Sequence, residues 1–266
     1  MFQEVMGKAH SIQLAVQAIG SIIAGFIYAI NVHLPLLVSA VFMLIAGIVS
    51  FSFKEVSKSK KNVKVNYIAQ IKGSCKFAIN HTKIKGLIIY TMVFYIFYRM
   101  GFMLFQPYMS AVKIDVKFFG IIFFIFNTVA AITSRYSHKI IKQTKRKTLT
   151  FLASLIVISF LLLAFMKIWI GVFAILLQQV ARGLYTPVTR KYFNKYLESD
   201  KRATVLSFAS LMTRLASSLS CPFLGLLQDN GNVFNTHFVI GIVMFIMMVF
   251  VLNYLNKIMG IMEAKS

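Results

Sequence analysis

Residues 148–166 read TLTFLASLIVISFLLLAFM, and the residues immediately before them, 142–147, read KQTKRK. The apolar segment contains no charged residue, and Lys167 follows it directly. A helix needs roughly 20 mostly apolar residues to cross the hydrocarbon core of a bilayer. Basic residues concentrate on the cytoplasmic side of such helices. This stretch therefore predicts a transmembrane helix that begins at the cytoplasmic surface.

Seven further segments resemble this one in length and composition. The eight predicted spans cover residues 11–31, 34–53, 86–108, 117–134, 148–166, 168–189, 204–226 and 236–256. The composition agrees, because 58% of the residues are apolar and the mean hydropathy is +0.75. The polar, turn-rich segments that separate the strands of a soluble βαβ protein are missing from the sequence. The sequence thus predicts an all-α, polytopic membrane protein with eight transmembrane helices.

The charge of the chain predicts its orientation. Basic residues outnumber acidic ones by 29 to 7, so the formal net charge is +22. Of these basic residues, 23 fall on one predicted side of the membrane, and only Lys113, Lys117 and Lys167 fall on the other. Cytoplasmic loops carry such an excess, so we expect a cell-membrane protein with both termini and the segment 54–85 in the cytoplasm. A nucleic-acid-binding protein would be less apolar, and the expected partner is the lipid bilayer, not nucleic acid.

The segment 54–85 is the one long loop of the predicted topology. Apolar residues recur in its second part at Ile68, Ile71, Cys75 and Ala78, a spacing of 3, 4 and 3. This spacing predicts a short amphipathic helix on the inner leaflet, with lysines near anionic headgroups. A solvated linker is the alternative.

The predicted spans lack the side chains of most catalytic and metal sites. The acidic residues all lie in loops, turns or terminal segments, at Glu4, Glu55, Asp115, Glu198, Asp200, Asp229 and Glu263. No span pairs a histidine with an acidic residue, and the sequence has no phosphate-binding GxxxxGK[ST] run. We therefore expect no enzyme activity, no metal site and no cofactor.

Polar side chains within the spans share helix faces. A polar group in hydrocarbon is expensive, so it normally faces protein or a water-filled cavity. Residues separated by three, four or seven positions lie on one side of a helix. The predicted cavity residues are Tyr95, Arg99, Gln106, Asn127, Gln178, Arg182, Tyr185 and Arg214. For each arginine, a structural charge pair or snorkelling to the surface is the alternative.

Small residues form a second pattern, in the first and seventh spans. Gly20 and Gly25 lie in the first, and Pro222 and Gly225 lie in the seventh. Small residues let helices approach closely, which predicts a helix-packing motif at these positions.

Three local segments carry a family resemblance. They are GSIIAG at 20–25, CPFLG at 221–225 and SDKRATVLS at 199–207. Together with the eight-span layout and the charge pattern, they resemble the major facilitator superfamily of secondary transporters over essentially the whole chain. The first looks like the fifth-helix motif of proton-coupled efflux members, with Ser21 where that motif has proline and Ala24 where it has glycine.

The resemblance implies a partial fold that corresponds to helices five to twelve of a twelve-helix, N-terminally truncated transporter. The implied domains are 1–53, the last two helices of the N-terminal half; 54–85, the basic central loop; 86–258, the six-helix C-terminal half; and 259–266, a cytoplasmic tail. A missing four-helix segment is an implied partner. The third and sixth spans would face the cavity, and the first, fourth and seventh would flank it.

The function that the resemblance implies is transport of a small molecule by alternating access between two halves. Proton-coupled efflux is the mode that the 20–25 segment suggests. A different hypothesis is a transporter fragment, or a helix-packing membrane protein, without transport activity of its own.

Overall fold

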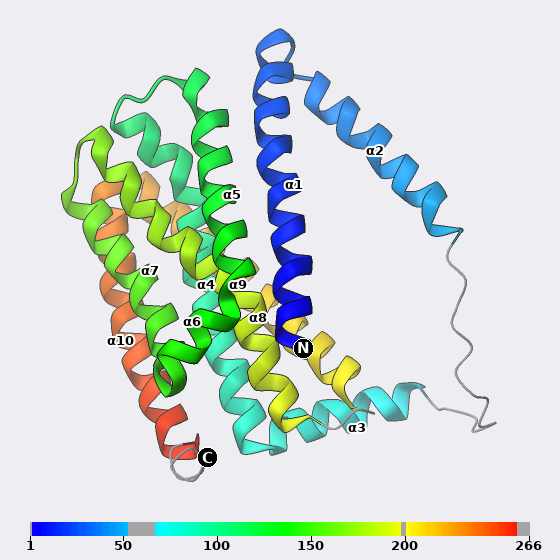
Figure 1. Cartoon of the computed structure of the whole chain (residues 1–266). Coiled ribbons are helices and arrows are strands. Elements are labelled where there is room, and N and C mark those ends of the chain that lie inside the picture. The colour runs from blue at the N-terminus through cyan, green and yellow to red at the C-terminus, as the bar shows by residue number, and fades with distance from the viewer. Residues whose placement is uncertain (1, 53–66, 198–200, 260–266) are drawn as a thin grey trace.

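The computed structural model describes residues 2–52, 67–197 and 201–259, and contains no strand within these ranges (Figure 1). The α-helices are α1 (Phe2–Ile30), α2 (Leu34–Ser50), α3 (Tyr67–Asn80), α4 (Thr82–Ala111), α5 (Phe119–Arg135), α6 (Ser137–Thr144), α7 (Thr148–Phe165), α8 (Ile175–Tyr196), α9 (Arg202–Asp229) and α10 (Val233–Met259). Short 3-10 helices are η1 (Val116–Phe118), η2 (Lys145–Lys147) and η3 (Trp169–Ala174). The all-α prediction is confirmed for this part of the chain.

Each predicted span coincides with a helix, but the count of eight membrane-crossing helices is not confirmed. Among the described residues, five helices are long and apolar enough to cross a membrane: α1, α4, α5 together with η1, α7 and α10. Helix α2 is apolar but has only 17 residues. Helices α8 and α9 are longer, but polar and basic side chains interrupt their apolar residues.

Helices α4, α5, α7, α8, α9 and α10 form one bundle. Helix α4 packs on α9, α10, α8 and α7, while α8 also packs on α5 and α7. Large aromatic side chains fill the core, and Phe94, Phe105 and Phe160 are fully buried. The Tyr90 hydroxyl donates a hydrogen bond of 2.8 Å to the carbonyl of Leu149, which ties α4 to α7.

Helix α1 lies along α5 (Figure 1). The contact is close because small residues meet. A Cβ built at Gly25 would lie 3.6 Å from the Cα of Gly120, and one at Gly7 would lie 2.7 Å from the Ser134 carbonyl oxygen. Ser134 also donates a hydrogen bond of 3.2 Å to the Gly7 carbonyl. One face of α1 therefore packs against α5.

Helix α2 extends away from the bundle (Figure 1), and none of the residues Leu34–Ser50 is buried. It contacts α1 at the turn that joins the two helices. An apolar helix with no buried residue needs lipid or another helix to cover it.

Helix α3 lies across one end of the bundle, against α9 and α4 (Figure 1). The predicted helix in the second part of 54–85 is thereby confirmed, and residues 53–66 lie outside the described part. Ala78 is fully buried, whereas Lys72 and Lys76 are exposed, so the helix is amphipathic. Helix α4 begins at Thr82, inside the segment that was predicted as loop.

Candidate functional site

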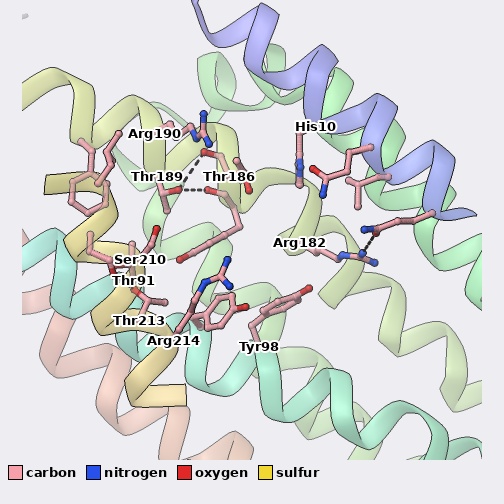
Figure 2. A pocket seen from close by; sticks show the side chains of 18 residues that line it. His10, Thr91, Tyr98, Arg182, Thr186, Thr189, Arg190, Ser210, Thr213 and Arg214 are labelled. Atoms are coloured by element: carbon pink, nitrogen blue, oxygen red, sulfur yellow. Dashed lines mark hydrogen bonds between the residues drawn. The ribbon is translucent and has the colours of Figure 1, made fainter. Parts of the chain in front are cut away.

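A cavity of about 500 Å³ opens between α1, α4, α8 and α9 (Figure 2). Its lining comprises three arginines, a histidine, three tyrosines, two glutamines, several hydroxyl side chains and a few apolar ones. These residues are His10, Gln13, Leu14, Gln17, Thr91, Tyr95, Tyr98, Arg182, Tyr185, Thr186, Thr189, Arg190, Phe193, Leu206, Ala209, Ser210, Thr213 and Arg214. A volume of this size matches sites for small organic molecules.

Arg182 joins the helices on one side of the cavity. Its Nη2 donates a hydrogen bond of 2.6 Å to the Gln17 Oε1 on α1. Its Nη1 donates one of 2.8 Å to the Asn127 Oδ1 on α5 and one of 3.3 Å to the Gln179 Oε1 on α8. All three acceptors are neutral amides, so the hydrogen bonds fix the guanidinium group without cancelling its charge.

Arg214 on α9 supplies a second guanidinium group. Arg182 and Arg214 both line the cavity, and Figure 2 shows Arg182 turned toward α1, with Tyr98 lying between the two arginines. Among the described residues, no hydrogen bond or ion pair joins Arg214 to a protein partner. Arg190 also lines the cavity, and its Nη1 lies 3.5 Å from the Met6 Sδ. None of the described lining residues is acidic, so the net charge of the lining is positive.

Aromatic rings form the wall on the α4 side. The rings of Tyr185 and Phe94 are stacked, with centroids 5.1 Å apart and an interplanar angle of 5°. Tyr95 packs at a tilt against Tyr185 and Tyr98, at centroid distances of 6.1 and 5.7 Å. This continuous aromatic surface can bind the flat, apolar body of a ligand.

Most threonine hydroxyls of the cavity donate hydrogen bonds to backbone carbonyls of their own helices. Thr91, Thr189 and Thr213 donate to backbone carbonyls three or four residues earlier, at distances of 2.7 to 2.9 Å. Their protons are therefore not directed at a ligand. The donors that remain for a ligand include the guanidinium groups, the tyrosine hydroxyls and the hydroxyls of Thr186 and Ser210.

The structure brings half of the predicted cavity residues to this lining: Tyr95, Arg182, Tyr185 and Arg214. Asn127 stands behind the lining and holds Arg182. Gln178 is fully buried between α7 and α8, where its Nε2 donates to the Ser159 Oγ at 3.0 Å.

Two predicted residues lie outside the cavity. Arg99 and Gln106 on α4 are exposed and are not among its lining residues. The Arg99 guanidinium carbon lies 5.4 Å from the centroid of the Phe102 ring, so this charge rests on an aromatic face of its own helix. Their predicted contact with substrate stays a prediction.

The glycines of the predicted packing motif differ from one another. Gly25 lies against Gly120 of α5, whereas a Cβ at Gly20 or Gly225 would meet no atom within 4 Å. Pro222 lies inside α9. Of the three glycines in the predicted motif, Gly25 alone lies at a close contact with another described helix.

Several lining residues were missed by sequence reasoning. His10, Gln13 and Gln17 recur at intervals of three and four residues on α1, and this stripe was visible in the sequence. The sequence did not single out Tyr98 as a cavity residue, because α4 carries aromatic residues on all sides. Within the described part of the chain, no three His, Cys, Asp or Glu residues gather as a metal site would require.

A second hollow, of about 530 Å³, lies between η1, α5, η3 and α8 and is mostly apolar. Its charged residues are Lys113, Asp115 and Lys117, and the last two form an ion pair of 2.9 Å. Hydrogen bonds from Lys117 hold the pKa of the Asp115 carboxyl below its usual value. This hollow therefore offers less unbalanced charge than the cavity.

An all-helical bundle with several membrane-spanning helices and a polar cavity between them defines a polytopic membrane protein with a solute-sized site. The sequence matches the profile of the Major Facilitator Superfamily over residues 86–258, so the chain belongs to this family of membrane transporters. Its members are transporters rather than enzymes. The chain is 27% identical over 238 residues to an uncharacterized MFS-type transporter, YxaM, of Bacillus subtilis (strain 168). That similarity covers 85% of this chain and 59% of the relative, so the chain spans less than two thirds of it.

Proposed function

We propose that this chain carries out secondary transport of a small solute by alternating access through the cavity between α1, α4, α8 and α9. The observation that carries the proposal is the joint lining of this cavity. Helices α8 and α9 and all but the first turn of α4 lie within the family-matched range, whereas α1 lies before it. Arg182 bridges the two parts through Gln17. A site between two bodies that can rock against each other is what alternating access needs.

The proposed topology follows the charge pattern. Both termini and the segment 54–85 lie in the cytoplasm, and the protein resides in the cell membrane. The proposed domains are 1–53, 54–85, 86–258 and 259–266. The exposure of α2 supports a further partner, a four-helix segment that would cover this helix. The greater length of the YxaM relative is in keeping with such a segment.

Proton-coupled efflux is the proposed mode, on the resemblance of residues 20–25. The described cavity lining holds no carboxylate, so His10 is the lining side chain whose type exchanges protons near neutral pH.

Two-sided thiol labelling tests the transport cycle without a known substrate. Cys75 and Cys221 are first replaced by serine, and Ser210→Cys is then introduced in the cavity. A membrane-impermeant maleimide is applied to right-side-out and to inside-out vesicles. Alternating access predicts labelling from both sides.

The matched control is Ser154→Cys on α7, which does not line the cavity and should stay unlabelled from either side. Labelling of Ser210→Cys from one side only would contradict alternating access. That result would instead support the hypothesis of a fragment without transport activity.

A further inference from the structure

We infer that the cavity selects organic anions, with a carboxylate or phosphate group held by Arg182 and Arg214 and an aromatic body on the tyrosine wall. This inference rests on the proposed function, because it names the substrate class of the same cavity.

The charge of the lining is the first step. Arg182, Arg190 and Arg214 reach the cavity, and none of the described lining residues is acidic. A cationic lining repels cationic solutes and attracts anions, and the low dielectric of a membrane interior strengthens both effects.

The second step concerns the hydrogen-bond partners of the two guanidinium groups. Three amide oxygens hold Arg182, so its position is fixed while its charge stays uncompensated. Arg214 lacks a partner among the described residues. A planar guanidinium group binds a carboxylate or phosphate through two parallel hydrogen bonds. Arg214 keeps its donors free for such an anion, and the positive charge of Arg182 in the same lining adds to the attraction.

The shape of the wall is the third step. Tyr185 stacks on Phe94, and Tyr95 packs against both Tyr185 and Tyr98. Figure 2 shows Tyr98 lying between Arg182 and Arg214. Rings beside guanidinium groups favour a ligand with an anionic head and a flat apolar body over inorganic phosphate or a small dicarboxylate.

Equilibrium binding to the purified full chain in lipid nanodiscs tests this inference. The probes are benzoate, phenyl phosphate and benzamide, which has nearly the shape of benzoate without its charge. We expect at least one of the two anions to bind about tenfold more tightly than benzamide, and the better anion identifies the headgroup. Equal affinity for benzamide, or no binding of either anion up to about 10 mM, would overturn the inference.

Variants assign the binding to the cavity. Arg214→Ala should weaken anion binding about tenfold, and Arg214→Lys should restore it only in part, because an ammonium group lacks the two-pronged geometry. Arg135→Ala removes an exposed arginine outside the cavity and should leave the affinity unchanged. Helical content by circular dichroism identifies a variant that fails to fold, and Arg214→Gln then replaces it. Unchanged anion affinity in a folded Arg214 variant would overturn the inference.

The results separate this inference from the proposed function. Two-sided labelling of Ser210→Cys without anion binding would leave transport standing and refute the substrate class. Anion binding with labelling from one side only would refute transport and leave the substrate class standing.

Discussion

Arg182 on α8 donates a hydrogen bond of 2.6 Å to the side-chain oxygen of Gln17 on α1. The bond crosses the cavity rim between the family-matched helices and the helix that precedes them. An interhelical hydrogen bond in a membrane protein contributes about 0.6 kcal/mol on average. A contact of this strength holds α1 and α8 together without preventing their separation during a transport cycle.

Replacing Gln17→Glu should convert this contact into an ion pair. A carboxylate beside Arg182 would strengthen the α1–α8 contact and cancel one positive charge of the cavity. We expect a higher melting temperature together with about tenfold weaker anion binding. Thermal melting and benzoate titration of the same preparation measure both.

The paired variant is Gln17→Ala, which removes the hydrogen bond but keeps the charge of Arg182. It should lower stability by about 0.5–1 kcal/mol, with a smaller effect on anion binding than Gln17→Glu. Equal weakening of anion binding in both variants would contradict a specific effect of the added negative charge.

Gly183 on α8 is required for the contact with α5. A Cβ there would overlap the carbonyl oxygen of Ala130, and a backbone atom cannot rotate away. Gly183→Ala should therefore separate α8 from α5 and lower stability by about 1–3 kcal/mol. Thermal unfolding in detergent gives the measurement.

Gly225→Ala is the matched control, since its Cβ would enter open space. Alanine is the better helix former, so this variant should melt at the same or a higher temperature. An equal loss of stability in both variants would contradict the helix packing described for α8 and α5.

Ser159 on α7 and Gln178 on α8 form a buried hydrogen bond, and the Ser159 hydroxyl itself donates to the Ala174 carbonyl at 2.7 Å. Ser159→Ala leaves a buried amide N–H without an acceptor and should cost about 1 kcal/mol. Ser154→Ala provides the comparison, because that hydroxyl bonds within its own helix. Chemical denaturation should show a clear loss for the first variant and almost none for the second.

The orientation of the chain predicts where introduced cysteines react, in a chain with Cys75 and Cys221 replaced by serine. Lys76→Cys on α3 should react from the cytoplasmic side, and Lys113→Cys and Asn230→Cys, at turns on the opposite side, should react from outside. Reaction of the cysteine at position 113 from inside would contradict the positive-inside assignment.

Much of the fold follows from the sequence because apolar length and basic flanks act locally. The run 148–166, for example, becomes α7 at Thr148–Phe165. The number of membrane-crossing helices does not follow, because α8 and α9 combine sufficient length with too many polar residues. Such helices depend on tertiary packing, which hydropathy does not measure.

The cavity was predictable only in part. Arg182 and Tyr185 fall on one face of α8, and that face points into the cavity. Arg99 and Gln106 share a face with Tyr95 by spacing, yet both are exposed and neither lines the cavity. Helical periodicity relates side chains of one helix to each other, but it does not decide which of them meet the neighbouring helices. The contribution of His10 and Gln17 depends on where α1 packs, which no local pattern fixes.

The most direct measurement is uptake of phenyl phosphate, a membrane-impermeant organic anion, into liposomes that contain the purified chain. We predict saturable uptake above that of protein-free liposomes, lost in Arg214→Ala and kept in Arg135→Ala. Uptake that is independent of Arg214, or no uptake by a folded chain that binds the anion, would contradict transport of organic anions through this cavity.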